Sequence, residues 1–457
     1  MANPAATQEV DAIIIGMGPA GESVGGERSE AGPAVAGIEG GLVGGECPYW
    51  GCVPSKMMIR AANLLAESRR VSELAGSSST TSAWSLVADR IRDHATDNWD
   101  DTVAVDRFVN KGGKFVRGYA EIISAGLVEV SDEHYRARTG IVVATGTRAA
   151  VPPIPGLADT PFWTNHEVME AKELPKSLIV LGGGTIGAEI SQVMARFGVD
   201  VSVVEGAERL LPNNEPEAGD VLREVFEAEG ITVHTGQFAT AVRYENERFG
   251  LDMPDGETIE AERLLVATGR QTFLRELGVE AIGLDADARF LSTDERQRVR
   301  PGVWAVGDIA GDGMFTHLGT RQADVAVADI LGNQIEPLNL DALSAVTFTD
   351  PEVGAVGQTE AQAREAGISV ATAFKPVAHT ARGWLHSAGN EGFIKLVVDA
   401  DRDVLVGATS VGPVGGEVLG LLALAVHAAI PIATLRSMIY AYPTFHKGVE
   451  DALKEIG

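Results

Sequence analysis

Cys47 and Cys52 are the only cysteines in this chain of 457 residues, and four residues separate them. That spacing suits one helical turn or a tight loop that brings the two sulfur atoms together. A buried cysteine pair and half of a metal site are the alternatives. Zinc needs two more ligands, yet no other cysteine exists and the nine histidines show no paired ligand spacing nearby. The pair therefore indicates redox chemistry.

A glycine-rich loop near the N-terminus predicts a first dinucleotide site. Gly16, Gly18 and Gly21 follow an apolar strand pattern and precede a helical one. The first glycine permits a tight turn, the second lets the backbone approach a pyrophosphate, and the third allows close helix packing. A second strand, 34–38, ends at Glu39, which can accept hydrogen bonds from a ribose. A plain glycine-rich turn is the alternative.

The helix expected after this loop, residues 22–31, contains Gly25 and Gly26. Each glycine costs about 1 kcal/mol relative to alanine inside a helix. We therefore expect this helix to be locally soft.

A second fingerprint consists of Gly182, Gly184 and Gly187, followed by a helix and a strand that ends at Glu205. Two fingerprints imply two bound dinucleotides, one for each module. Glu205 would bond a ribose 2′-hydroxyl and repel a 2′-phosphate, although Arg209 lies one turn further on. The sequence therefore favours NADH over NADPH.

Three further segments resemble the closing parts of such modules. Ala-Thr-Gly occurs twice at the end of an apolar run, finishing at Gly146 and at Gly269. A third apolar run delivers Asp308 at its carboxyl end, where open α/β sheets bind ligands. Asp308 is thus a candidate for bonding a cofactor hydroxyl, with a surface turn as the alternative.

The chain length suggests roughly three domains. The predicted fold class is α/β, with two Rossmann-like dinucleotide-binding modules and a C-terminal α+β domain, where strands give way to helices. The predicted domains are 1–153 (first module with the cysteines), 154–270 (second module), 271–336 (rest of the first module) and 337–457 (α+β domain).

Charge and hydropathy exclude several classes of protein. The net charge of −27 disfavours binding to nucleic acid or to anionic membranes. No apolar run approaches the ~18 residues of a membrane helix, and the N-terminus lacks a leader pattern. We expect a cytoplasmic protein, whose cysteines cycle between dithiol and disulfide.

Together these motifs, in this order, resemble the class I pyridine nucleotide-disulfide oxidoreductases. These FAD-dependent homodimers include dihydrolipoamide dehydrogenase, glutathione reductase and mercuric reductase, and the resemblance covers nearly the whole chain. It implies FAD bound by Gly16, Gly18, Gly21, Glu39 and Asp308. It implies NAD(P)H bound by Gly182, Gly184, Gly187 and Glu205. Gly146 and Gly269, which close the two modules, are further candidates for binding a cofactor.

The resemblance also implies a mechanism. Hydride passes from the nicotinamide to the flavin, and the reduced flavin opens a Cys47–Cys52 disulfide. Cys52 would lie against the flavin as a thiolate, while Cys47 would attack the substrate. Lys56 and Glu189 would form an ion pair beside the flavin ring.

The chain departs from the family at the acid/base group. The family's partner subunit supplies His-Pro-Thr-x-x-Glu, but here Tyr442 stands in place of the histidine and Lys447 in place of the glutamate. His446 and Glu450, one turn apart on the expected last helix, could form a displaced dyad. A structural histidine facing the dimer is the alternative.

Other departures concern substrate choice. Arg270 is not followed by the usual Pro-Asn pair, and Tyr49 and Trp50 between the cysteines are bulkier than usual. The leading hypothesis is an NAD(P)H-dependent flavoprotein that reduces a disulfide or a similar electrophile. The alternatives are a dihydrolipoamide dehydrogenase, a reductase of a quinone, metal ion or other non-thiol acceptor, and a flavoprotein without enzymatic activity.

Overall fold

The computed structural model describes residues 7–30 and 34–456. These residues form two compact units, each built from three separate stretches of chain. The first unit comprises the chain up to Pro54, Asp89–Ala149 and Arg270–Leu338; the second comprises Ser55–Ala88, Ala150–Gly269 and the chain from Asn339. The domain boundaries at 153, 270 and 336 remain predictions.

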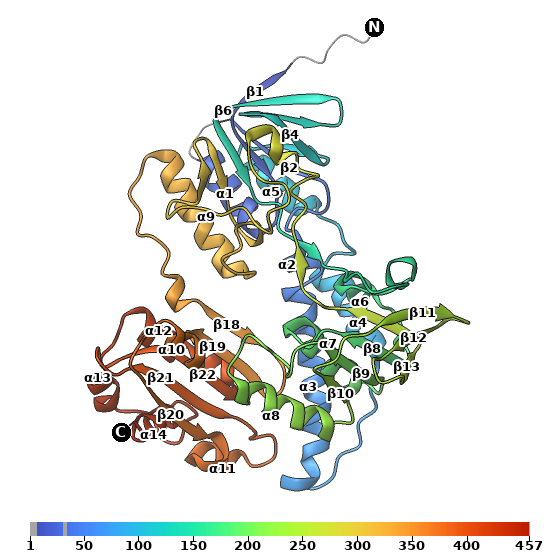
Figure 1. Ribbon diagram of the computed structural model, residues 1–457, viewed down its shortest axis with the longest axis vertical. Helices are drawn as coiled ribbons and strands as arrows, with labels where there is room; N and C mark the ends of the chain where they lie inside the picture. The colour runs from blue at the N-terminus through green and yellow to red at the C-terminus, as the bar shows by residue number, and fades with distance from the viewer. Residues whose placement is uncertain (1–6, 31–33, 457) are drawn as a thin grey trace. The chain divides into compact units, whose positions relative to one another are not determined.

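The first unit contains a twisted sheet whose central strands are parallel (Figure 1). Along it the strand order is β16 (Arg298–Arg300), β17 (Val303–Ala305), β6 (Glu133–Val143), β1 (Gln8–Ile15), β2 (Val35–Glu39) and β3 (Lys114–Arg117). Strands β4 (Ala120–Ser124) and β5 (Leu127–Val130) extend it through β6, and β7 (Arg148–Ala149) pairs separately with β15 (Arg270–Gln271). This order joins segments from distant parts of the chain into one sheet.

Helix α1 (Pro19–Glu30) connects β1 to β2 and packs against α9 (Thr316–Leu331). The predicted helix covered residues 22–31; the structure begins it three residues earlier, and Ala31 lies outside the described residues. Gly25 has a packing role, because a Cβ there would lie 3.0 Å from the ring of Phe108 in α5 (Thr102–Asn110). The local softness of α1 remains a prediction.

The second unit contains a parallel sheet in the order β10 (Thr232–Thr235), β9 (Asp200–Glu205), β8 (Ser177–Leu181) and β14 (Arg263–Val266). Helices α6 (Asn165–Glu170), α7 (Thr185–Arg196) and α8 (Pro216–Ala228) belong to the same stretch of chain as this sheet. A three-stranded antiparallel sheet interrupts the pattern with β11 (Ala241–Glu245), β12 (Arg248–Asp252) and β13 (Thr258–Ala261). The unit thus repeats the β1–α1–β2 arrangement of the first unit as β8–α7–β9.

The C-terminal part of the second unit is a five-stranded antiparallel sheet, as Figure 1 shows. The order is β18 (Ser344–Thr347), β19 (Glu352–Gly357), β22 (Val404–Gly412), β21 (Phe393–Asp399) and β20 (Val370–Pro376). Its helices are α10 (Glu360–Glu365), α11 (Ala381–His386), α12 (Gly415–His427), α13 (Ile432–Ser437) and α14 (Lys447–Leu453). The apolar helix α12 packs on β19 and β22, so the predicted α+β architecture is confirmed.

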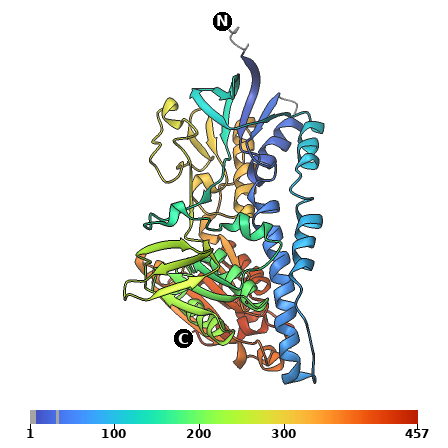
Figure 2. The same ribbon diagram turned by 90° about the vertical axis from the view of Figure 1, so that its right-hand side faces the viewer.

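Helix α3 (Cys52–Leu74) carries the second cysteine at its first position and appears as one long helix in Figure 2. The sequence has helical character over residues 57–66, but the observed helix extends further in both directions. The observed helix is longer because Pro54 is compatible with a first turn, and no glycine or proline follows until Gly76. A serine- and threonine-rich stretch, 77–82, then leads to α4 (Trp84–Arg90).

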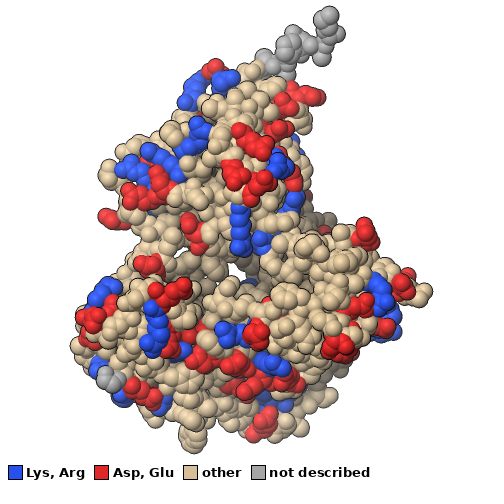
Figure 3. Space-filling view, in the orientation of Figure 1, with Lys and Arg blue, Asp and Glu red and all other residues tan. Residues whose placement is uncertain are grey.

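Acidic and basic side chains are mixed over the face drawn in Figure 3. Such mixing, together with the excess of acidic residues, leaves no broad basic area on that face for a polyanion. Within the described part of the chain, no helix is both long enough and apolar enough to cross a membrane.

Candidate active site

The two cysteines lie in the first unit, where α2 (Glu46–Tyr49) leads into α3. Cys47 is half-buried and Cys52 is exposed. The Sγ atom of Cys52 lies 3.6 Å from Oγ1 of Thr316, the first residue of α9. Two helix N-termini therefore meet at Cys52. Their backbone N–H groups and dipoles favour a negatively charged sulfur there.

Lys56 lies one turn beyond Cys52 on α3, within the second unit, and pairs with a buried carboxylate of that same unit. Its Nζ is 2.8 Å from Oε2 of Glu189, whose side chain is 4% exposed. The other oxygen of Glu189 accepts the backbone N–H of Phe348 at 2.8 Å, and Lys56 lies over the Phe348 ring. Because both oxygens of Glu189 are engaged, the ammonium is held in one position.

The first glycine loop has the geometry that a pyrophosphate needs. Gly16 has φ +93°, and a Cβ there would lie 2.4 Å from the carbonyl oxygen of Ala144. A Cβ at Gly21 would lie 1.9 Å from the Gly16 carbonyl oxygen, so α1 can pack closely only with glycine. Gly18 has no atom nearer than 4.0 Å to such a Cβ. Its face is thus open to a phosphate.

Glu39 ends β2 beside this loop. Its two carboxylate oxygens accept the backbone N–H groups of Met17 at 2.7 Å and Gly41 at 2.8 Å. Burial raises the pKa of Glu39, and these two N–H groups oppose that effect. The carboxylate is therefore fixed at the carboxyl edge of the sheet.

Asp308 follows β17 at the same edge and takes part in a cluster that the sequence did not predict. Thr147 Oγ1 donates to its carboxylate at 2.8 Å, and Arg270 donates to Thr147 while lying 3.9 Å from Asp308 and 3.4 Å from Glu46. Burial raises the pKa of Asp308, and Thr147 and Arg270 oppose it. The sequence pointed to Thr147 and Arg270 only through their positions. Thr147 directly follows Gly146, and Arg270 directly follows Gly269.

The residues of the first module fit a dinucleotide. Gly146 has φ +64° and no atom within 4 Å of a Cβ. Next to it, the hydroxyl of Thr145 is buried without a hydrogen-bond partner among the described residues. An open backbone face, two fixed carboxylates and an unsatisfied hydroxyl match the phosphates and sugar hydroxyls of such a cofactor.

The second glycine loop repeats this geometry in the second unit. Gly182 has φ +105°, and a Cβ at Gly187 would lie 1.9 Å from the Gly182 carbonyl oxygen. Gly184 has no atom within 4 Å of a Cβ. The oxygens of Glu205 accept the N–H groups of Gly183 at 2.6 Å and Ala207 at 2.7 Å. Glu205 is therefore held as Glu39 is.

Two further residues, Gly269 and Arg209, were linked by the sequence to binding of the nicotinamide dinucleotide. Gly269 has φ +120° and an open Cβ position. Arg209 packs its side chain against the Cβ position of Gly219 in α8, and its Nε is buried without a partner among the described residues. The stem of the Arg209 side chain is therefore engaged in packing against α8.

The C-terminal candidates lie on and before α14. Tyr442 is 73% exposed, and His446 is an exposed residue at the N-cap of the helix. Glu450 forms ion pairs with Lys447 at 2.6 Å and Lys454 at 2.9 Å, and these hydrogen bonds lower its pKa. The structure thus brings Glu450 together with two lysines and not with His446.

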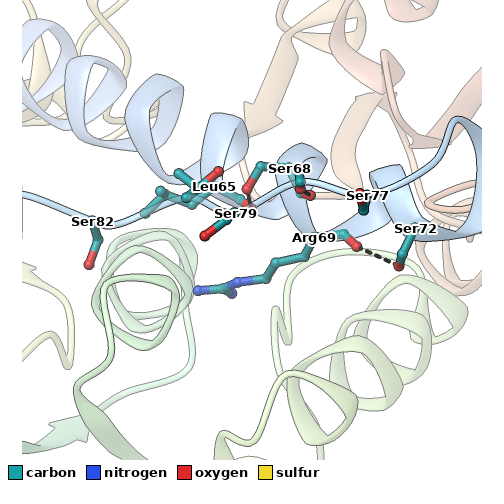
Figure 4. A pocket seen from close by; sticks show the side chains of 9 residues that line it. Leu65, Ser68, Arg69, Ser72, Ser77, Ser79 and Ser82 are labelled. Atoms are coloured by element: carbon teal, nitrogen blue, oxygen red, sulfur yellow. Dashed lines mark hydrogen bonds between the residues drawn. The ribbon is translucent and has the colours of Figure 1, made fainter.

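A separate hollow of about 420 Å³ lies between α3 and the segment 77–82 (Figure 4). Its polar side chains largely bond the main chain: Arg69 donates to the carbonyl of Arg196 at 2.6 Å, and Ser78 donates to that of Ser68. The Ser78 bond ties the loop to α3, and the Arg69 bond ties α3 to the end of α7. Elsewhere in the described ranges, no group of three histidine, cysteine, aspartate or glutamate side chains could hold a metal ion.

Comparison with known proteins gives the family. Residues 10–329 match the family model described as pyridine nucleotide-disulphide oxidoreductase, and residues 343–453 match the dimerisation domain of the same family. A dihydrolipoyl dehydrogenase of Haloferax volcanii is 32% identical over 96% of this chain and 94% of its own length. A mercuric reductase of Bacillus cereus is 30% identical over 99% of this chain and 72% of its own length.

Solved structures agree. The HOCl-induced flavoprotein disulfide reductase RclA from Escherichia coli matches 97% of this chain and 99% of its own with a TM-score of 0.85 and 25% identity. LpdA from Mycobacterium tuberculosis matches 98% and 99% with the same TM-score and identity. With both family models matched along nearly the whole chain, the protein belongs to the pyridine nucleotide-disulfide oxidoreductases and is a flavin-dependent oxidoreductase of a family that uses FAD and NAD(P)H.

Proposed function

We propose that this enzyme reduces a small disulfide, or a similar electrophile, with electrons from NADH that pass through Cys47 and Cys52. The observation that carries the proposal is the position of Cys52 at the start of α3, 3.6 Å from the first residue of α9. A sulfur at two helix N-termini is suited to being a thiolate, the reactive form of cysteine. The cytoplasm, which keeps thiols reduced, suits a pair that must cycle.

The dinucleotides would occupy the two glycine loops. Gly16, Gly18, Gly21, Glu39, Gly146 and Asp308 would hold FAD, and Gly182, Gly184, Gly187, Glu205 and Gly269 would hold the nicotinamide cofactor. FAD supplies the step that the side chains cannot perform, because it accepts a hydride and returns two electrons to a disulfide.

The chain's own thiols would then carry out the exchange. Cys47 attacks one sulfur of the substrate disulfide, forms a mixed disulfide and releases the first substrate thiolate. Cys52 attacks the sulfur of Cys47, releases the second thiolate and closes the Cys47–Cys52 disulfide. Two electrons and two protons reach the substrate in total. The exposure of Cys52 is consistent with a group that must also contact the flavin.

Lys56 and Glu189 would keep a positive charge beside the reacting groups. Since Glu189 is fixed by the N–H of Phe348, it positions the Lys56 ammonium. Lys56→Met should therefore slow reduction of the enzyme by NADH, while Lys56→Arg should retain part of the rate.

The acid/base group has two candidates. An imidazole titrates close to neutral pH, whereas a phenol does not, which favours His446 over Tyr442. Because Glu450 is engaged by two lysines, it would tune the charge around His446 without forming a dyad. His446→Ala should then slow substrate reduction by roughly 10²–10⁴-fold and spare reduction by NADH, with less effect from Tyr442→Phe.

We propose a two-fold homodimer, which would bring the segment 442–450 to the other subunit's cysteines. The dimerisation-domain match supports this, as do large apolar side chains left in solvent. Ile439 is 99% exposed, Leu424 56% and Met438 40%. An active monomer in light scattering would reject the arrangement.

The decisive experiment separates reduction by NADH from reduction of the substrate. The wild type, Cys47→Ser and Cys52→Ser are titrated anaerobically with NADH and then supplied with disulfides, quinones or metal ions. We expect both variants to bleach their flavin but to lose disulfide reduction. Before NADH is added, Cys47→Ser should show a long-wavelength charge-transfer band between the Cys52 thiolate and the oxidised flavin, and Cys52→Ser should show no such band. A band that survives in Cys52→Ser would reject the assignment of Cys52.

A second candidate function is reduction of a non-thiol acceptor such as a quinone or a metal ion. Two observations favour it: Glu450 pairs with lysines and Tyr442 replaces the family's histidine. The acid/base pair that a disulfide reductase of this family uses is therefore not assembled here in its usual form. If the two serine variants reduce a quinone at the wild-type rate and no disulfide is turned over by any of the three proteins, this function replaces the first.

A further inference from the structure

Trp50, which lies between the two cysteines, is stacked on a second tryptophan far away in the sequence. The ring centroids of Trp50 and Trp99 are 5.7 Å apart and their planes differ by 26°. Trp50 is the C-cap residue of α2, and its backbone N–H donates to the carbonyl of Glu46 at 2.8 Å. The position of its ring is therefore coupled to the short stretch of backbone that separates Cys47 from Cys52.

Trp99 occupies a strained backbone. Asp97, Asn98 and Trp99 have φ of +47°, +56° and +56°, and none of them is glycine. Such conformations are costly for side-chain-bearing residues and persist only when their surroundings fix them. A π-helix, Ile91–Ala95, directly precedes the segment, and insertions of this kind are frequent at functional sites.

Hydrogen bonds hold the strained segment in place. The N–H of Asn98 donates to the carbonyl of Arg92 at 2.6 Å, and the N–H of Trp99 donates to the hydroxyl of the buried Thr96 at 3.3 Å. The indole nitrogen of Trp99 is nevertheless buried without a hydrogen-bond partner among the described residues. The fold thus accepts an unsatisfied donor in order to place this ring against Trp50.

The same segment contacts the cysteine loop a second time. Asp101 accepts the backbone N–H of Val43 at 2.7 Å and is held by Arg117 at 2.6 Å. Val43 lies four residues before Cys47, and Trp50 lies two residues before Cys52. Residues 97–101 therefore contact the loop on both sides of Cys47, and we call these five residues the brace.

We propose that the brace, through Trp99, sets the effective concentration of the two thiols and hence the reduction potential of the Cys47–Cys52 pair. Trp99 is a positioning residue in this role. Closing the disulfide requires both sulfurs to meet, and a loop already held near that geometry loses less conformational entropy. The inference rests on the proposed function, since it requires that the two cysteines form a redox pair.

The test measures the thiol–disulfide equilibrium of the holoenzyme directly. In anaerobic dithiothreitol buffers, the Cys47–Cys52 disulfide accepts two electrons and two protons, and dithiothreitol becomes its cyclic disulfide. Maleimide labelling followed by mass measurement counts the thiols, and it reads this pair alone because the chain has only two cysteines.

We expect Trp99→Ala to lower the effective concentration of the thiols by about tenfold, which makes the pair easier to reduce by about 30 mV. Trp99→Phe, which keeps a ring for stacking, should stay within about threefold of the wild type. Trp384→Ala is the matched control, because Trp384 is 73% exposed on α11 and lies outside the brace. It should leave the equilibrium unchanged.

If Trp99→Ala does not fold, Trp99→Leu replaces it in the test. Leucine fills part of the space of the tryptophan side chain but has no aromatic ring to stack on Trp50. An unchanged equilibrium in a folded Trp99→Ala or Trp99→Leu protein overturns the inference, as does an equal shift in Trp384→Ala. A wild-type protein that keeps two free thiols at every buffer ratio rejects the proposed redox pair itself. The two failures are therefore distinguishable.

Discussion

The two glycine loops of this protein are built alike, but the helices that follow them are not. In both loops the first glycine has positive φ, and a Cβ at the third glycine would lie 1.9 Å from the first glycine's carbonyl oxygen. Glu39 and Glu205 both use their two oxygens to accept backbone N–H groups within their own modules. The turn and the acid are therefore constrained in the same way, whichever dinucleotide is bound.

The two helices that follow the loops differ in their residues: one is closely packed and the other contains two further glycines. Helix α7 buries an almost continuous run of residues after Gly187, whereas α1 contains Gly25 and Gly26. Gly25 makes room for Phe108, but the nearest atom to a Cβ at Gly26 is the flexible end of Lys111 at 3.2 Å. In each glycine loop, backbone atoms leave no room for a side chain at the third glycine. In α1, only neighbouring side chains limit which residues can replace Gly25 and Gly26.

The largest expected effect comes from the third glycines. Gly21→Ala and Gly187→Ala should each destabilise the fold by about 3 kcal/mol, because the new methyl group overlaps a carbonyl oxygen. Urea unfolding measures this. The controls Gly18→Ala and Gly184→Ala should unfold like the wild type, yet weaken binding of FAD and NADH respectively. Equal stability of all four variants would contradict the comparison.

The paired acids should give the next largest effect. Glu205→Ala should lower the ratio of kcat/KM for NADH to that for NADPH by roughly 10–100-fold, since a charged hydrogen bond is worth about 1.5–3 kcal/mol. Glu39→Ala should weaken FAD binding by a similar factor and leave the nucleotide ratio unchanged. A wild-type preference for NADPH would mean that Arg209 outweighs Glu205.

An aromatic ring covers the glycine that follows each acid, and its removal should have a smaller effect. A Cβ at Gly40 would lie 2.6 Å from the ring of Tyr119, and one at Gly206 would lie 2.2 Å from that of Phe238. Both rings are largely exposed and are suited to stacking on a base.

Phe238→Ala should therefore raise the Kd for NADH about fivefold without changing FAD content, and Tyr119→Ala should weaken FAD alone. Fluorescence titration of each variant gives both values. Each variant is the other's control, and a loss of both cofactors in either one would contradict the prediction.

The smallest effect tests the softness of α1. Gly26→Ala should raise the free energy of unfolding by about 0.5–1 kcal/mol, because alanine favours the helix and only the end of a lysine must move. Gly25→Ala should instead be neutral or destabilising, since its methyl group meets the Phe108 ring. Thermal unfolding of the two variants separates them.

The sequence predicted the features that local chemistry determines. The glycine loops, the acids that end β2 and β9, and the cysteine pair could be found because their residue types follow from turn and redox chemistry. The long α3 was underestimated because helical pattern alone does not set helix ends. Contacts between residues distant in sequence, such as Thr147 and Arg270 around Asp308, or Trp99 on Trp50, left no local signal.

One feature has a consequence for the lifetime of the enzyme in an oxidising cell. Cys52 is exposed in the polypeptide itself. A thiolate that peroxide can reach is converted stepwise to sulfenic and then sulfinic acid, and the second step is irreversible for most proteins. If FAD binds over this sulfur as proposed, protein that has not yet received its cofactor, or has released it, is the population that oxidants would inactivate permanently.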